Sequence, residues 1–198
     1  MEYLITILSG YIVGCLNPAY VISKLKKDDI RRHGTNNAGA CNTFITYGKW
    51  LGIFVGLFDI FKCFAVTKLC VYLFPRFEFA YVLSGTFCII GHIFPAFLKF
   101  RGGKGFASLI GMILSYDWRV FLVLAAIEII LILSLDYICV ASISAPIIFW
   151  VILLFHSIPC AAVFLVPMIV IVAKHAVNIR RIQQGTEIPI HTLWKKEK

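Results

Sequence analysis

Charged residues are scarce in this sequence. Only 15% of its 198 residues are Asp, Glu, Lys or Arg, whereas a soluble domain averages about 25%. Hydrophobic residues make up 60%, against about 45–50% in soluble domains, and the mean hydropathy is +0.88. The excess is too large for one buried core. The composition therefore excludes an ordinary soluble protein and predicts that lipid surrounds much of the chain.

Several signatures of covalent and metal-dependent catalysis are also missing. The chain has no CxxC pair among its seven cysteines, no cluster with metal-ligand spacing and no dinucleotide-binding fingerprint. It also lacks a GxSxG nucleophile elbow and a Ser-His-Asp order. We therefore expect neither disulfides nor a bound metal, and the sequence implies no CoA or nucleotide.

Long runs without charged residues predict membrane-spanning helices, because a bilayer core needs about 20 apolar residues. The run 137–173 is long enough for two passes with a turn at 156–159. The segments 106–116 and 120–135 are shorter and fit either re-entrant helices or full passes. Further spans are expected at 3–23, 50–74 and 79–98. The sequence thus predicts an all-α integral membrane protein with about seven helices, or five if neither short segment crosses.

Basic residues gather in three segments of this chain, which we expect to form one polytopic domain over 1–198. Most of the 19 Lys and Arg residues lie in or beside 26–49, 99–105 and 174–198, and few lie in the alternate turns. The positive-inside rule then places these segments and the C-terminus in the cytoplasm, and the N-terminus outside. Basic flanks explain the net charge of +9 without nucleic acid. The expected location is the cell inner membrane.

Two of the basic segments are rich in glycine. The first reads Gly34-Thr35-Asn36-Asn37-Ala38-Gly39. Gly and Asn tolerate positive φ and let successive N–H groups point into one concavity. The second reads Gly102-Gly103-Lys104-Gly105 and leads into an apolar run, so a helix start and an ammonium group would meet an anion there. Flexible linkers that merely orient the helices are the alternative interpretation of both.

The third basic segment carries two polar residues with helical spacing. His175 and Asn178 are three residues apart and share a face if the last span continues into the cytoplasm, and Gly185 would end that helix. Within the membrane, Asp59 and Lys62 have the same spacing and can pair. That pair either braces a site from behind or takes part in its chemistry.

These segments resemble the bacterial acyl-phosphate:glycerol-3-phosphate acyltransferases, the PlsY family. The resemblance covers nearly the whole chain in order and spacing. The matching stretches are GTNNAGACNTFITYGKWLG at 34–52, DIFKC at 59–63, GHIFPAFLKFRGGKG at 91–105 and HAVNIRRIQQGTE at 175–187. The family is known for transfer of a fatty acyl group from acyl phosphate to the sn-1 hydroxyl of glycerol 3-phosphate. The product is lysophosphatidic acid, a precursor in phospholipid biosynthesis.

The resemblance also implies site residues. The catalytic positions would be His175, Lys104 and Thr35, with either His175 or a substrate phosphate oxygen taking the proton of the acceptor hydroxyl. One phosphate would lie at the Lys104 loop. The substrate-binding positions would be Asn37, Gly39, Asn42, Lys49, Gly102, Gly103, Ser142, Asn178 and Glu187. Acyl-chain preference and oligomeric state are left open.

The chain departs from the family pattern at several positions. Thr35 replaces a serine, Cys41 replaces a threonine, and Asn36 replaces a glycine, which is tolerable if φ is positive there. Ile45 stands where the pattern has a phosphate-contacting arginine, and Asp136 stands at a position that is basic in the pattern. These changes keep two alternatives open. The chain could be a catalytically impaired paralogue that binds phospholipid precursors, or a transporter of phosphorylated solutes, although it shows no inverted repeat of broken helices.

Overall fold

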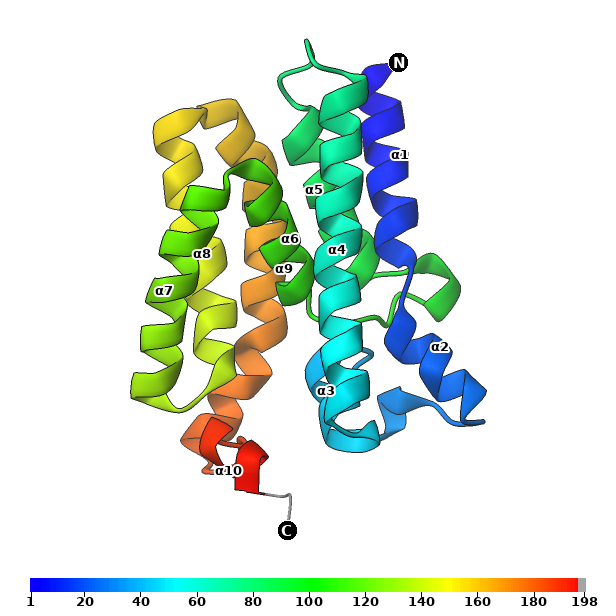
Figure 1. Cartoon of the computed structure of the whole chain (residues 1–198), viewed down its shortest axis with the longest axis vertical. Helices are drawn as coiled ribbons and strands as arrows, with labels where there is room; N and C mark the ends of the chain where they lie inside the picture. The colour runs from blue at the N-terminus through cyan, green and yellow to red at the C-terminus, as the bar shows by residue number, and fades with distance from the viewer. Residues whose placement is uncertain (196–198) are drawn as a thin grey trace. The chain divides into compact units, whose positions relative to one another are not determined.

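The protein is helical throughout the part that the structure describes. The computed structural model describes residues 1–195, and side chains as far as Thr192, so residues 196–198 of the expected cytoplasmic tail lie outside it. Within this range the chain forms ten α-helices and two 3-10 helices and no strand, which confirms the all-α prediction (Figure 1). The chain divides into two compact units, Met1–Tyr116 and Asp117–Lys198. A single domain over 1–198 stays a prediction.

The first unit is built on four helices. Helix α4 (Lys49–Leu73) contacts α1 (Glu2–Cys15), α5 (Ala80–Ile93) and α6 (Phe106–Tyr116), and α5 also packs on α1 and α6 (Figure 1). Shorter elements gather at the end of this unit opposite the N-terminus. They are α2 (Pro18–Leu25), the 3-10 helix η1 (Ile30–Arg32) and α3 (Ala40–Tyr47). The 3-10 helix η2 (Ala96–Leu98) follows α5.

Small residues allow α1 and α5 to pack with their backbones almost touching. A methyl group on Gly10 would lie 2.4 Å from the carbonyl oxygen of Ser84, and one on Gly14 would lie 2.2 Å from that of Cys88. Lipid gives helices no hydrophobic drive to associate, so such close van der Waals contact is a main source of helix pairing. The contact fixes α5, from which the chain passes through η2 to the second glycine-rich loop.

The second unit consists of α7 (Trp118–Leu135), α8 (Ile138–His156), α9 (Ile158–Gln183) and α10 (Ile190–Lys195). Helix α8 packs against both α7 and α9. The turn between α8 and α9 is the single residue Ser157, whose hydroxyl accepts a hydrogen bond from the Cys160 N–H. The expected two passes over 137–173, with a turn at 156–159, are therefore confirmed.

Within residues 1–195, six helical stretches are long and apolar enough to cross a membrane. They are Glu2–Leu25, Lys49–Leu73, Ala80–Leu98, Trp118–Leu135, Ile138–His156 and Ile158–Gln183. Helix α7, with 18 residues, is thus long enough, while α6 is a shorter apolar helix of 11 residues. By length and composition, this count lies within the predicted range of five to seven spans. The sequence interpretation missed one break, at Asn17 and Pro18, which divides the first span into α1 and α2.

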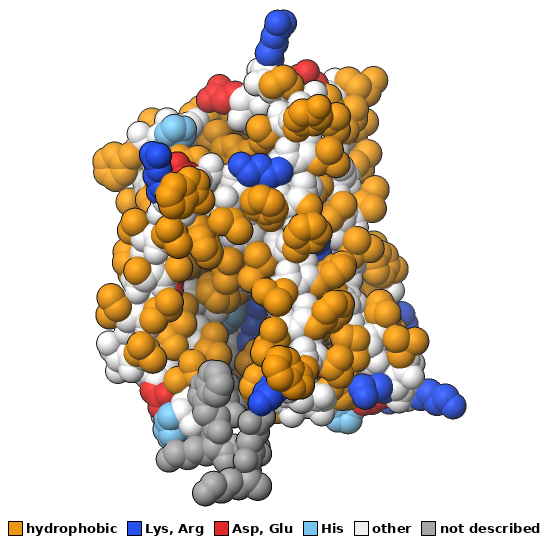
Figure 2. All heavy atoms as spheres, viewed as in Figure 1, with side chains coloured by type: hydrophobic (Ala, Val, Ile, Leu, Met, Phe, Trp, Pro, Cys, Tyr) orange, Lys and Arg blue, Asp and Glu red, His pale blue; other side chains and the backbone are white. Residues whose placement is uncertain are grey.

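Apolar side chains cover the outer flanks of the spans, as Figure 2 shows for one face. On α4, Leu57 and Phe61 are 61% and 65% exposed, and on α7, Ile130 and Leu133 are 64% and 72% exposed. Large exposed hydrophobic surfaces of this kind are unfavourable in water and mark contact with another apolar phase. The surfaces of both units therefore suit a bilayer, in agreement with the expected integral membrane protein.

Candidate active site

The first glycine-rich loop is organised around the buried side chain of Asn42. Its amide nitrogen donates to the carbonyl oxygens of Ile30 and Asn37 at 2.9 and 2.8 Å, and its Oδ1 accepts from the Thr35 N–H at 2.8 Å. Asn42 is fully buried, and both of its donors are used. This arrangement favours a positioning role for Asn42 over the expected direct contact with substrate.

Thr35 and Asn37 lie together on this loop. The Asn37 amide donates to Thr35 Oγ1 at 2.9 Å, so the hydroxyl proton of Thr35 is still available for an acceptor. Asn36 has a φ of 59°, the positive value that its place in the pattern requires. Gly34 also has a positive φ of 52°, and a methyl group there would lie 2.3 Å from Asn42 Oδ1. Both residues thus fit the turn that this loop makes.

The two glycine-rich loops meet in the first unit. The Ala38 N–H donates to the carbonyl oxygen of Gly102 at 3.2 Å, and Arg31 Nη1 donates to the carbonyl oxygen of Leu98 at 2.9 Å. A methyl group on Gly39 would lie 3.9 Å from Gly103 Cα. The structure therefore brings together the predicted residues of segments 26–49 and 99–105, which are about 60 positions apart in sequence.

The GGKG loop rests on the C-terminal end of α5. The Gly102 N–H donates to Ile93 O and the Gly103 N–H to His92 O, both at 3.1 Å. Lys104 is half-buried, and α6 begins at Phe106 immediately after Gly105, whose φ is 94°. This confirms the expected order of loop and helix. The unpaired N–H groups of a helix start favour an anion at this point.

Behind this loop lies a buried group of ionisable residues. Lys62 Nζ is 2.6 Å from Asp59 Oδ1, 2.6 Å from the carbonyl oxygen of Leu16 and 3.1 Å from His92 Nδ1. Asp59, Lys62 and His92 are each less than 5% exposed. The predicted Asp59–Lys62 pair therefore exists, and a histidine that sequence reasoning left unassigned joins it.

Two carboxylates just before the first glycine-rich loop, Asp28 and Asp29, are held by hydrogen bonds, and Asp29 binds the neighbouring Arg31. Hydrogen bonds from His33 and then Tyr47 lower the pKa of Asp28 to about 2, and a hydrogen bond from Arg31 lowers the pKa of Asp29 to about 2. Both groups are therefore charged at neutral pH. The Arg31 guanidinium donates hydrogen bonds to Asp29 and to the Leu98 carbonyl oxygen. It therefore does not replace the arginine that the family pattern has at position 45.

Two further predicted positions lie near the junction of α3 and α4. Lys49 is the first residue of α4, and its ammonium lies 5.4 Å from the centre of the Trp50 ring. Ile45 is half-buried on α3, three residues beyond Asn42 and so on the same helical face. A long side chain at 45 would lean back toward the start of α3, where the first loop lies.

In the second unit, His175 and Asn178 share a buried face of α9, as their spacing predicts. His175 Nδ1 lies 2.9 Å from the carbonyl oxygen of Ile171, and Asn178 Nδ2 donates to Glu187 Oε1 at 2.6 Å. Helix α9 ends at Gln183, and Gly185 follows with a φ of 66°. The expected glycine stop is confirmed, and the chain then returns Glu187 to Asn178.

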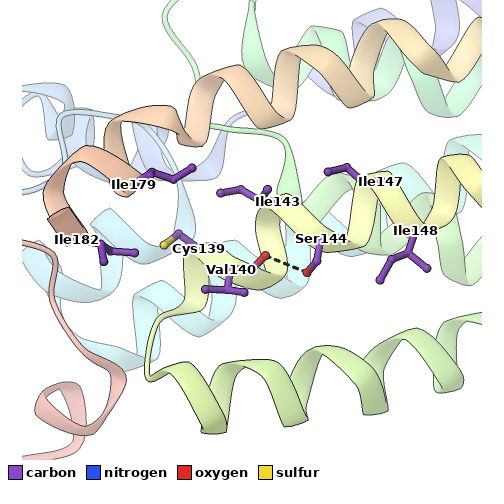
Figure 3. Close-up of a pocket in the computed structure, with 8 residues that line it drawn as sticks. All are labelled: Cys139, Val140, Ile143, Ser144, Ile147, Ile148, Ile179 and Ile182. Atoms are coloured by element: carbon purple, nitrogen blue, oxygen red, sulfur yellow. Dashed lines mark hydrogen bonds between the residues drawn. The ribbon is translucent and has the colours of Figure 1, made fainter.

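An apolar groove of about 430 Å³ lies in the same unit (Figure 3). The side chains along it come from α8 and from the end of α9. They are Cys139, Val140, Ile143, Ser144, Ile147, Ile148, Ile179 and Ile182. Ile179 and Ile182 lie one helical turn beyond His175 and Asn178, so the groove continues along α9 from the polar pair. Ser142, expected to bind substrate, is buried on α8, and its hydroxyl lies 3.4 Å from Ile138 O.

Two carboxylates of the second unit, Glu128 and Asp136, have hydrogen-bond partners. Ser144 Oγ donates to Glu128 Oε2 at 2.6 Å. Asp136 accepts from the His191 N–H at 3.1 Å and contacts the His191 ring, which lowers the pKa of the Asp136 carboxyl. Asp136, which stands where the family pattern has a basic residue, thus binds His191 in the segment that follows α9.

Comparison with known proteins identifies the family of this chain. The family model described as glycerol-3-phosphate acyltransferase matches residues 4–185. The chain belongs to the glycerol-3-phosphate acyltransferase family.

Individual members of the acyltransferase family match nearly end to end. Glycerol-3-phosphate acyltransferase 1 of Oceanobacillus iheyensis is 35% identical over all of this chain and 99% of its own length. A Staphylococcus aureus glycerol-3-phosphate acyltransferase is 34% identical over 94% of this chain and 97% of its own length. The crystal structure of PlsY in its glycerol 3-phosphate form covers all of both chains with a TM-score of 0.90 at 28% identity. Its lysophosphatidic acid form gives a TM-score of 0.84 at 27% identity.

The residue that sequence reasoning missed within this acyltransferase is His92. It lies in the GHIFPAFLKFRGGKG stretch, yet nothing in its local spacing links it to Asp59 and Lys62 on another helix. The one signal in the sequence was a histidine ten residues before Gly102, in a run that contains no Asp, Glu, Lys or Arg.

Proposed function

We propose that this chain transfers a fatty acyl group from acyl phosphate to the sn-1 hydroxyl of glycerol 3-phosphate and so makes lysophosphatidic acid. The observation that carries the proposal is the joined pair of glycine-rich loops in a member of this family, which brings Lys104 and the N–H groups at the start of α6 to one place for a phosphate. The names of the PlsY structures, one with glycerol 3-phosphate and one with lysophosphatidic acid, support the acceptor and the product.

In the first unit, the phosphate of one substrate would lie at the GGKG loop. Lys104 supplies the ammonium, and the start of α6 supplies N–H groups and the positive end of its dipole. The Thr35 hydroxyl, which accepts from Asn37, can donate its proton to a phosphate oxygen. Lys49 and Gly39 belong to the same group of substrate-binding residues in this proposal. The main catalytic contribution is then electrostatic: the site binds the two phosphate-bearing substrates close together and stabilises their negative charge.

In the second unit, His175 has the tautomer of a base. A carbonyl oxygen only accepts, so Nδ1 carries the proton that faces Ile171, and a neutral ring keeps its lone pair on Nε2. The acceptor hydroxyl oxygen bonds to the acyl carbon, the bond from that carbon to the phosphate oxygen breaks, and phosphate leaves. The hydroxyl proton passes to His175 Nε2 or to a phosphate oxygen of a substrate. Asn178, held by Glu187, and Ser142 complete the substrate-binding residues.

The groove along α8 and α9 suits the acyl chain. Its wall is aliphatic apart from Cys139 and the Ser144 hydroxyl, and it begins one turn beyond Asn178. Apolar clefts with few polar groups are the usual binding sites for ligands of this kind. A chain that enters from Asn178 would keep its reactive end beside the polar residues of α9 and its tail among isoleucines.

Turnover by the purified protein tests this function. With acyl phosphate and labelled glycerol 3-phosphate, we expect labelled lysophosphatidic acid, and no product when acyl-CoA replaces acyl phosphate. An impaired paralogue would bind glycerol 3-phosphate without turnover. A transporter would move the label into sealed proteoliposomes without forming lipid. Either of these results contradicts the proposed reaction.

We further propose that the joined loops and the end of α9 face the cytoplasm, in the cell inner membrane. The distribution of Lys and Arg supports this orientation. Native Cys41 is exposed in the first turn of α3, directly after the first loop, and can serve as a probe once the other six cysteines are replaced. We expect Cys41, Arg101→Cys and Thr186→Cys to be protected from an impermeant thiol reagent in intact cells. Arg76→Cys, in the turn between α4 and α5, should be labelled; labelling of any of the first three would reverse the orientation.

A further inference from the structure

The ring of His92 lies directly under the GGKG loop. A methyl group on Gly103 would lie 2.1 Å from His92 Nε2 and 2.8 Å from Cε1, so the loop can rest on the ring only because this residue is glycine. Gly103 also lies beside Gly39 of the first loop, where a methyl group on Gly39 would come within 3.9 Å of Gly103 Cα. The position of the ring therefore determines how closely the two loops approach one another.

The ring is fixed by the buried residues of α4. His92 Nδ1 lies 3.1 Å from Lys62 Nζ and 3.3 Å from Asp59 Oδ1, so both members of the ion pair hold this edge of the ring, and Nε2 is the atom next to Gly103. Lys62 is itself held by Asp59 at 2.6 Å and by the Leu16 carbonyl at 2.6 Å. Because both Lys62 and Asp59 hold Nδ1, the imidazole has one orientation. Burial of these charges is costly without such complete pairing.

We propose that His92 is a positioning residue for phosphate binding, with Asp59 and Lys62 as its support. The ring sets the height of Gly103 and thereby the distance between the GGKG loop and the first loop. The inference rests on the proposed function, because it assigns the joined loops to a substrate phosphate. Displacement of the loop by about 1 Å is expected to lower the reaction rate about a hundredfold, even when every group that contacts substrate is present.

A double-mutant cycle with a matched control tests this role. Gly103→Ala introduces a methyl group against the His92 ring, whereas Gly102→Ala introduces one 2.1 Å from the His92 carbonyl oxygen, which no change of side chain removes. His92→Asn keeps a polar atom at the position of Nδ1 and deletes Nε2 and Cε1, the two ring atoms nearest to a methyl group on Gly103. The three single variants and the two double variants are compared by kcat/KM for glycerol 3-phosphate and by KM for each substrate.

We expect His92→Asn to raise KM about tenfold for one substrate only, the one whose phosphate lies at the loop, because Gly103 no longer rests on the imidazole ring. Gly103→Ala should lower kcat/KM for glycerol 3-phosphate about a hundredfold in the wild-type background and less than about threefold in the His92→Asn background. Gly102→Ala should cost the same factor in both backgrounds. Equal costs of Gly103→Ala in the two backgrounds, or equal effects on both substrates, would overturn the role of His92.

Failure of the proposed function has a different signature. If the wild type binds glycerol 3-phosphate but makes no lipid, the double-mutant cycle can be measured with the Kd for glycerol 3-phosphate in place of kcat/KM. The effects of the substitutions at positions 92 and 103 on this Kd should still be coupled. If Gly103→Ala does not fold, His92→Asn should restore a monodisperse elution profile to it and should not restore one to Gly102→Ala. Rescue of both glycine variants, or of neither, would contradict the specific contact.

Discussion

Replacing Lys104 with alanine should lower kcat/KM by about thirtyfold to nearly a thousandfold, equivalent to roughly 2–4 kcal/mol of transition-state stabilisation. The ammonium is one of the few charges placed between the glycines and the start of α6, where phosphate charge is expected. Removing it leaves the N–H groups at the start of α6, so some activity should survive. The measurement is steady-state kinetics with purified protein, acyl phosphate and glycerol 3-phosphate.

Lys99→Ala is the matched control for this loss. Lys99 lies in the same segment, carries the same charge and is exposed. Exposed charges interact weakly through water, so its removal should change kcat/KM by less than about threefold. If Lys104→Ala also retains activity within about threefold while folding normally, the GGKG loop orients the helices and does not contact phosphate.

Introducing arginine at position 45 should improve an active enzyme. Ile45 shares a helical face with Asn42, and a longer side chain there would reach back to the loop that contains Thr35 and Asn37. A charge-assisted hydrogen bond is worth about 1.5–3 kcal/mol, so Ile45→Arg should raise kcat/KM by roughly ten- to over a hundredfold. Separate values of KM for the two substrates would show which phosphate the new group binds.

Ile45→Met and Ile45→Lys separate charge from shape. Methionine tests the length of the side chain alone, and lysine adds a charge without the planar, multidentate geometry of arginine. A non-catalytic paralogue would stay silent in all three variants. A fully active wild type that Ile45→Arg inhibits would show that another cation, such as Lys49 or Arg101, has taken the position. Arg31 is not a candidate, because Asp29 and the Leu98 carbonyl occupy it.

Most of the helices could be predicted because they depend on local apolar runs. The run at 106–116 corresponds to α6, and the turn expected at 156–159 contains Ser157. The glycine stop after α9 was also predictable, since Gly185 tolerates the positive φ of a helix end without strain. The break at Asn17 was missed because the run remains apolar across it, and hydropathy alone does not register a capping side chain.

The contacts that shape the site depend on residues far apart in sequence. His92 meets Lys62 from a different helix, Asn42 reaches back to Ile30 and Asn37, and His191 meets Asp136 across 55 positions. Spacing within one helix predicts a shared face, as it did for His175 and Asn178, but it does not predict which face meets another helix. The sequence therefore indicated the residue types of the site and not the support beneath them.

The length of α9 has a consequence for how substrate reaches the enzyme. Its 26 residues extend roughly 39 Å, whereas the hydrocarbon of a bilayer is about 30 Å thick. A helix that enters the hydrocarbon at Ile158 leaves it about 20 residues later, close to Asn178, which would place the polar pair of α9 at the depth of the lipid headgroups. In the proposed reaction, the acyl donor and the single-chain product would lie at the same depth. Both would then arrive and leave by lateral diffusion, and the concentration that governs turnover would be a mole fraction in the leaflet.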